Sequence, residues 1–242
     1  MPDPVTAAPP VTVENTGRNT GENTGTMANA VLRGAAIGFC GKLPARGDFV
    51  AAGLPRSFVE AWHDWLQSGL ATSRHALGET WVAAWLEAPI WRFALSPGIC
   101  GPDAVLGLWM PSVDRVGRYF PLTFAAVMPG ADPATLISEG GGFLAAVECA
   151  GLDALADDLA PDAVAARLAA TASAEPNDAG TDPELCPPAG ALWWSAGSPR
   201  VSRTAFATSS LPDEAVFTGM LDAGSLSPAE GQEDLARYSR EP

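Results

Sequence analysis

Apolar residues recur along this chain with two spacings, one typical of helices and one typical of strands. The longest helical pattern lies between residues 57 and 70, where bulky side chains follow at i, i+4, i+7 and i+8. The members of this apolar face are Phe58, Trp62, Trp65, Leu66, Gly69 and Leu70. The preceding Leu-Pro-Arg-Ser segment is expected to open the helix, with Ser57 as its cap.

Shorter helical patterns follow. One spans about residues 80–87 and is stopped by Pro89, because the residue before a proline avoids the helical conformation. Further helices are expected at 133–156, at 161–171 and in the segment LPDEAVFTGML.

Short apolar runs between Pro- and Gly-rich turns predict strands. They lie at residues 31–41, 91–96, 104–110, 121–128, 191–197 and 201–207, the last two forming a hairpin. Strands cluster between helices instead of alternating with them. The pattern therefore predicts an α+β fold, a mainly antiparallel β-sheet packed with helices, in a single domain with disordered termini.

Three segments carry too little apolar surface to fold. Residues 1–30 are rich in Pro, Thr, Asn and Gly, repeat NTG, and are expected to form a disordered low-complexity tail. Met27, which follows the repeat, is a candidate start of the protein. The folded domain is expected at 31–222, followed by a flexible acidic tail at 223–242. The polar segment SAEPNDAGTDPELCPP is expected to be mobile.

The formal net charge is −14, and it is unevenly spread. Residues 31–130 hold eight basic and seven acidic residues, whereas residues 131–242 hold five basic and 18 acidic ones. Phosphate contacts need clustered Lys and Arg, so this balance argues against nucleic acid and against anionic membranes as partners. The chain has one lysine, Lys42.

No apolar run reaches the roughly 18 residues needed to span a membrane, and the N-terminus lacks the features of a secretory signal. A cytoplasmic protein without direct membrane insertion is therefore expected. The cysteines are scattered and form no CxxC pair, which favours free thiols over a zinc site or a disulfide framework. They are Cys40, Cys100, Cys149 and Cys186. No cofactor is predicted.

The segment GFCGKLPARGDF resembles two motifs that it does not match. A P-loop needs GxxxxGK followed by Ser or Thr, but here Leu43 follows the lysine and Ala36 occupies the first glycine position. The RGD tripeptide is interpreted as coincidence. A tight turn is the favoured interpretation, with Asp48 bonding neighbouring amides.

The sequence offers little material for catalysis. Nucleophilic catalysis needs Ser or Cys beside a base, and the chain has two histidines and no GxSxG motif. Cys40 beside His63 is the one conceivable nucleophile and base pair. Acidic residues are too scattered to suggest a metal site. We therefore expect a protein that is not an enzyme.

The segment PSVDRVGRYFPLT places three charges among core-type residues. Asp114 and Arg118 are four residues apart, so they point to the same side and can form an ion pair. Three interpretations stay open: an ion pair that orders the loop, recognition of a partner or small anion through Arg115 and Arg118, and catalysis. The candidate partner-binding or loop-ordering residues are Lys42, Arg46, Asp48, Arg92, Ser112, Asp114, Arg115 and Arg118.

Several long blocks together resemble the TagF family, an accessory family associated with bacterial type VI secretion. They are GFCGKLPARGDFV, FVEAWHDWLQSGL, APIWRFALSPGICGPDAVLGLWMPSVDRVGRYFPLT, ALWWSAGS and LPDEAVFTGML, which span about residues 34–220. His63 departs from the family pattern, which is closer to Trp-Asp-x-Trp-Leu.

The resemblance implies a cytoplasmic, non-enzymatic regulator. Such a protein represses the secretion system after translation by binding a protein, with a forkhead-associated scaffold as the expected partner. The alternative is a hydrolase or transferase of small substrates, or an anion-binding module that uses the 111–118 loop.

Overall fold

The computed structural model describes residues 32, 34–171, 181, 185, 187 and 189–225. The predicted disordered segment at 1–30, most of the polar segment before the terminal hairpin and the acidic tail beyond residue 225 lie outside these residues.

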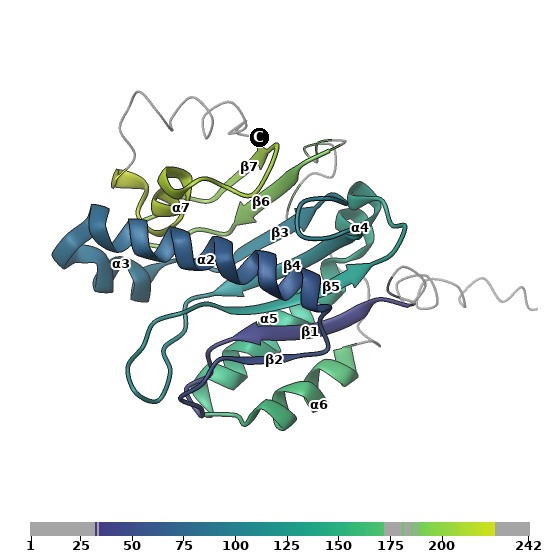
Figure 1. Cartoon of the computed structure of the whole chain (residues 1–242), viewed down its shortest axis with the longest axis horizontal. Helices are drawn as coiled ribbons and strands as arrows, with labels where there is room; N and C mark the ends of the chain where they lie inside the picture. Colours follow the sequence, from purple (N-terminus) through teal and green to yellow (C-terminus); the bar gives the residue numbers. More distant parts are fainter. Residues whose placement is uncertain are drawn as a thin grey trace, which may run out of the picture.

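Seven strands form one antiparallel sheet in the order β2-β1-β5-β4-β3-β6-β7 (Figure 1). The strands are β1 (Ala36–Gly41), β2 (Val50–Ala52), β3 (Trp91–Leu95), β4 (Ala104–Met110), β5 (Leu122–Met128), β6 (Ala191–Ser195) and β7 (Thr204–Thr208). The predicted α+β class and the predicted hairpin, now β6 and β7, are both confirmed.

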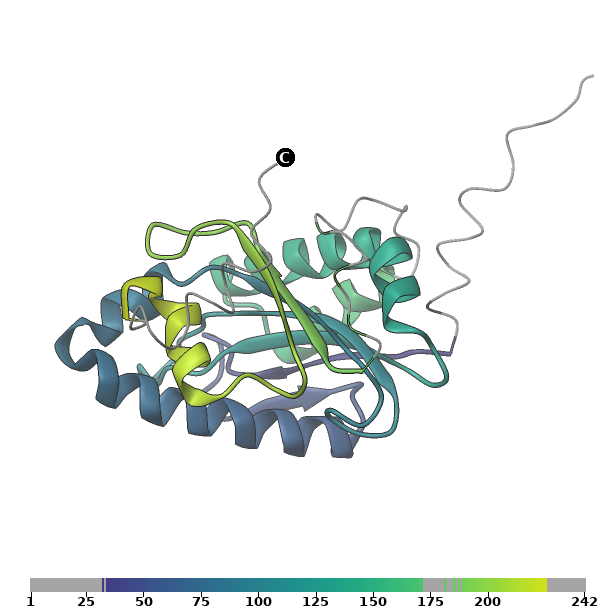
Figure 2. The same ribbon diagram turned by 90° about the horizontal axis from the view of Figure 1, so that it is seen from above.

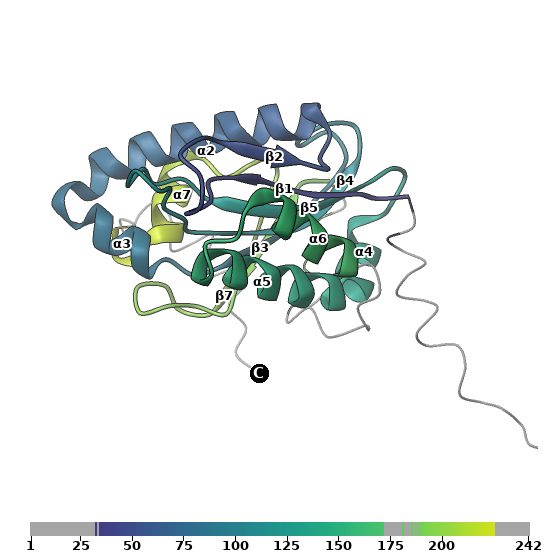
Figure 3. The same ribbon diagram turned by 90° about the horizontal axis from the view of Figure 1, so that it is seen from below.

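Helices cover both faces of the sheet, so the domain has three layers (Figures 2 and 3). One face carries α2 (Arg56–Leu77), the 3-10 turn η1 (Gly78–Thr80), α3 (Trp81–Glu87) and α7 (Glu214–Leu221), which is followed by η3 (Ala223–Ser225). The other carries α4 (Pro133–Glu139), α5 (Gly141–Ala156) and α6 (Pro161–Thr171).

The two faces have separate apolar cores. Along β3, Trp91 and Phe93 belong to the core beneath α2, whereas Ala94 belongs to the core beneath α5. The central strands β4 and β5 are buried at every position. Burial on both faces explains why their sequences are continuous apolar runs and not alternating ones.

Buried tryptophans occupy the core beneath α2, and most of their indole N–H groups have hydrogen-bond partners, although that of Trp109 has none among the described residues. Trp62 Nε1 donates to Thr123 Oγ1 at 3.0 Å, and Trp91 Nε1 donates to the Met220 carbonyl at 3.0 Å. Seven of the eight tryptophans are buried and Trp65 is half-buried.

Three predicted details differ from the structure. Helix α2 begins at Arg56 after Pro55, and Ser57 does not cap it. The helix expected at 133–156 is interrupted at Gly140, where a side chain would lie 2.2 Å from Leu106 Cδ2. The short edge strand β2 was not predicted, because its three residues, two of them exposed, are too few to show an alternating pattern.

The contact between α2 and α7 yields a stability prediction. A Cβ at Gly69 would lie 2.5 Å from the ring of Phe217, which is fully buried. Gly69→Ala should therefore lower the free energy of unfolding by about 2 kcal/mol, although alanine favours helices. Urea denaturation measures this. Thr72→Ala, on the exposed side of the same helix, is the control, and equal stability of the two variants would contradict the close contact.

Candidate functional site

A tight turn projects from the connection between β4 and β5. The Gly117 amide donates to the Asp114 carbonyl at 2.9 Å, and the Asp114 amide donates to the Arg118 carbonyl at 3.0 Å. Gly117 has φ +82°, a conformation that favours glycine. Aspartate at the first position and glycine at the fourth are the residues that such turns prefer.

The Asp114 carboxylate accepts four hydrogen bonds, two on each oxygen. Oδ1 accepts from the amides of Val116 at 3.0 Å and Arg118 at 2.9 Å. Oδ2 accepts from Lys42 Nζ at 2.6 Å and Arg118 Nε at 2.7 Å. The side chain has no solvent exposure. Its hydrogen-bonding capacity is therefore filled by the protein alone. We call this arrangement the Asp114 clamp.

These contacts control the ionisation of the carboxylate. Burial of Asp114 acts to raise its pKa, but the hydrogen bonds from Lys42, Arg118 and Val116 together outweigh burial. The pKa is therefore held well below its usual range, and Asp114 stays charged at neutral pH.

Further hydrogen bonds join this turn to the segment that follows β1 and to α3. Ser112 Oγ donates to the Lys42 carbonyl at 2.8 Å, and the Arg115 amide donates to the Arg46 carbonyl at 3.3 Å. Trp85 Nε1, from α3, donates to the Ser112 carbonyl at 3.2 Å. Three segments that are distant in sequence are thus fixed around one carboxylate.

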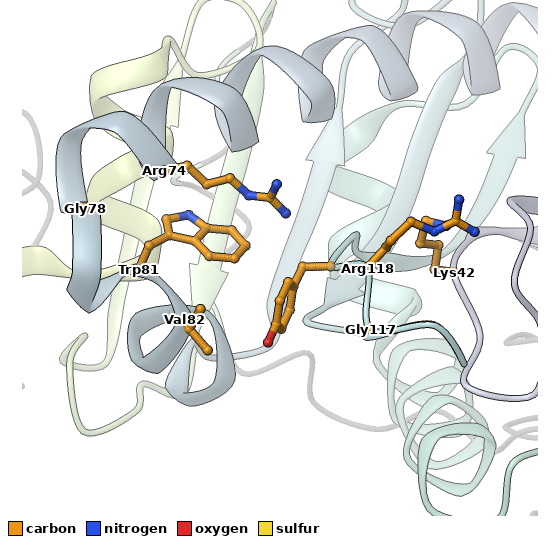
Figure 4. Close-up of a pocket in the computed structure, with 8 residues that line it drawn as sticks. Lys42, Arg74, Gly78, Trp81, Val82, Gly117 and Arg118 are labelled. Atoms are coloured by element: carbon orange, nitrogen blue, oxygen red, sulfur yellow. The ribbon is translucent and has the colours of Figure 1, made fainter.

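A cleft of about 660 Å³ lies between this turn and the junction of α2 with α3 (Figure 4). Three cationic side chains line it, Arg74 from α2 on one side, Lys42 and Arg118 on the other. The Arg74 guanidinium carbon lies 4.4 Å from the centre of the Trp81 ring. The remaining lining residues are Gly78, Trp81, Val82, Gly117 and Tyr119.

The structure brings most of the predicted site residues together. The Asp114 side chain bonds the side chains of Lys42 and Arg118, and the Ser112 hydroxyl donates to the Lys42 backbone carbonyl. Arg115 and Arg46 are joined through their backbones.

Two of the predicted residues do not join the clamp. Asp48 is exposed and makes no hydrogen bond with any described residue, so the prediction that it bonds neighbouring amides is wrong. Arg92 pairs with Glu148 of α5, on the other face of the sheet.

Arg74, Trp81 and Tyr119 were not among the predicted site residues. One signal for Arg74 was present in the sequence. Positions i−4 and i+4 from it are Leu70 and Gly78, so it has no acidic neighbour along the helix with which to pair. In the sequence alone Trp81 and Tyr119 are typical of core residues, and their position beside the cleft depends on tertiary structure.

Cys40 and His63, the conceivable nucleophile and base, form no hydrogen bond with each other in the described part of the chain. Cys40 is buried in β1, and burial raises the pKa of its thiol to about 12, which disfavours the reactive thiolate. His63 Nδ1 lies 3.7 Å from Asp64 Oδ1.

The described residues contain neither a metal-ligand cluster nor a membrane-spanning helix. No group of three or more His, Cys, Asp or Glu there is placed to hold a metal ion. No helix there is both long and apolar enough to cross a membrane.

The fold and the site define a class: an α+β domain with one antiparallel sheet, in which a buried carboxylate orders the wall of a basic cleft. Comparison with known families then gives a specific assignment. Residues 38–171 match the TagF N-terminal domain, described as type VI secretion system-associated. The chain belongs to this family and is a type VI secretion-associated protein.

A solved structure is similar to this chain. It is PA0076 from Pseudomonas aeruginosa PAO1, with 34% sequence identity and a TM-score of 0.59. The similar region covers 77% of this chain and 94% of that one. Among curated proteins, none matches this chain.

The Asp114 clamp predicts a specific pattern of stability. Asp114→Ala leaves Lys42 and Arg118 without their carboxylate and should lower the free energy of unfolding by about 3 kcal/mol. Lys42→Met should lower the free energy of unfolding of the wild-type protein. In a protein that already carries Asp114→Ala, the same substitution should lower it little further. Chemical denaturation of the four proteins measures this coupling. Asp222→Ala is the control, because Asp222 is bonded by Arg200, which keeps Glu87 as a second partner. Additive effects would show that Lys42 and Asp114 do not act together.

The ionisation of Asp114 predicts a dependence on pH. Its pKa is lowered in the folded state, so the unfolded chain takes up the proton first as the pH falls. The contribution of the Asp114 carboxylate to the free energy of unfolding should therefore be complete at neutral pH and should decline from about pH 4 downward. The stability difference between the wild type and Asp114→Asn, measured in denaturant at several pH values, should narrow in acid. A difference that stays constant down to low pH would contradict the lowered pKa.

Proposed function

We propose that this chain is a non-enzymatic, cytoplasmic regulator of a bacterial type VI secretion system. It represses the system after translation by binding a protein component, with a forkhead-associated scaffold as the partner. Family membership supports the association with secretion, and the TagF resemblance supports the repressor role and the identity of the partner.

The observation that carries the proposal is a surface of exposed apolar side chains around the basic cleft. The described residues include five exposed large apolar side chains: Phe49, Val82, Leu86, Val116 and Leu152. Val82 lines the cleft, Leu86 lies one turn further along α3, and Val116 precedes Gly117 in the turn at 114–117. Phe49 instead packs against His63 and Phe120. We call Val82, Leu86, Val116 and the cleft the cleft face.

Apolar side chains that gather on one surface favour protein binding, because their removal from water stabilises a complex. Leu86 is 63% exposed and Val116 is 64% exposed, so both offer surface that a partner can cover. The Asp114 clamp orders the turn that carries Val116, which reduces the entropy lost on binding.

Repression by binding acts through mass action. The regulator occupies the scaffold, and the fraction of free scaffold falls with the concentration of regulator. Repression should therefore depend on the ratio of the two proteins and need no turnover.

The proposal predicts that two matched variants behave differently. Leu86→Glu places a charge on the cleft face, whereas Leu152→Glu places one on α5, across the sheet. Leu86→Glu should weaken capture of the purified scaffold by about tenfold or more, and Leu152→Glu should leave it nearly unchanged. Binding is measured with purified proteins, and effector release is measured in cells that carry each variant.

Three results would contradict the proposal. They are failure of the wild-type chain to retain the scaffold or any other secretion component, equal binding by the two variants, and unchanged effector release after deletion of the chain. Melting temperatures of both variants establish that they fold.

A further inference from the structure

The cleft concentrates positive charge in a strongly acidic chain. Arg74, Lys42 and Arg118 line it, and no Asp or Glu is among its lining residues. Asp114 neutralises one of these three charges through the clamp. An excess of two positive charges remains in a protein with a net charge of −14.

The hydrogen-bond donors of these cations are largely unused. Arg118 donates its Nε to Asp114, and its two terminal nitrogens have no partner among the described residues. The Arg74 guanidinium forms no ion pair or hydrogen bond there, and it rests on the Trp81 ring. Lys42 uses one of its three N–H groups.

The cations are also held in place. Trp81 is fixed beneath Arg74, because its Nε1 donates to Ser73 Oγ at 2.9 Å and its ring stacks on Trp85. The Asp114 clamp fixes Lys42 and Arg118. A site whose donors are ordered before binding loses less entropy when an anion arrives.

The surroundings of the cleft distinguish a protein segment from a small ion. Val82 lines the cleft and is 43% exposed, and the exposed Leu86 and Val116 lie on the elements that border it. A free anion would leave these apolar side chains in water. A peptide with acidic and apolar residues would match both the charge and the apolar rim.

We infer that this cleft receives an anionic side chain, a carboxylate or a phosphoryl group, from a segment of the partner protein. The anion binds to the cationic side chains that line the cleft, Arg74 above all, and apolar neighbours in the segment cover Val82 and Leu86. The inference rests on the proposed function for the identity of the partner, and on the cleft alone for the chemistry of its ligand.

The test uses a short dye-labelled peptide that alternates Glu with Leu, a counterpart with Gln in place of Glu, and a counterpart with phosphoserine. Fluorescence anisotropy with the full chain should show binding of the Glu and phosphoserine peptides, weakening as salt is added. Arg74→Glu should weaken this binding by about tenfold or more, and Arg74→Gln by less. Arg56→Glu, at the exposed other end of the same helix, should leave it unchanged.

Several results would overturn the inference. They are no binding of either anionic peptide, equal binding of the Gln peptide, or equal binding by wild type and the two Arg74 variants. Displacement of the peptide by inorganic phosphate at matching concentration would instead assign the cleft to a small anion. Melting temperatures show whether Arg74→Glu is folded, and Arg74→Gln decides the matter if it is not.

A parallel measurement with the purified forkhead-associated scaffold separates the two proposals. If the scaffold binds wild type and both Arg74 variants equally, the inference fails and the proposed function stands. If the anionic peptides bind through Arg74 but the scaffold does not bind at all, the inference stands and the proposed partner is wrong.

Discussion

The arrangement of the cleft face depends on one buried carboxylate, that of Asp114. Its two oxygens accept four hydrogen bonds, from the turn that carries it and from Lys42 after β1. Burial of a carboxylate is strongly unfavourable unless protein donors replace the hydrogen bonds that it made to water. Loss of any one of the donors should therefore weaken the whole arrangement. The clamp therefore fixes the position of the turn relative to the sheet, and with it the position of Arg118.

The sheet supplies the rigid base on which this clamp is built. Burial on both faces makes β4 and β5 the centre of two cores, and the turn at 114–117 is the connection between these two strands. Trp85 links the same connection to α3 through the Ser112 carbonyl. A binding surface built on such elements is ordered before its partner arrives, which favours recognition of one partner over many.

The cleft gathers three cationic side chains in a protein whose net charge is −14. The net negative charge of the chain disfavours the approach of acidic ligands, whereas the cations of the cleft favour it, so such a ligand is oriented toward the cleft before contact. Arg74 and Arg118 come from segments 44 residues apart in sequence, and the fold sets them on opposite walls of the cleft (Figure 4). Apolar side chains beside these cations supply contact area, which the charges alone do not.

The sequence by itself determined the α+β class, the apolar face of α2, the terminal hairpin and the pairing of Asp114 with Arg118, because each follows from spacing within a short segment. It did not determine the break at Gly140 or the strand β2, whose causes are close contacts and pairing with distant residues. Nor did it place Lys42 against Asp114, 72 residues away, or Arg74 across the cleft from Arg118. Those contacts join segments that only the folded sheet and its helices bring together, so tertiary structure alone decided where the site lies.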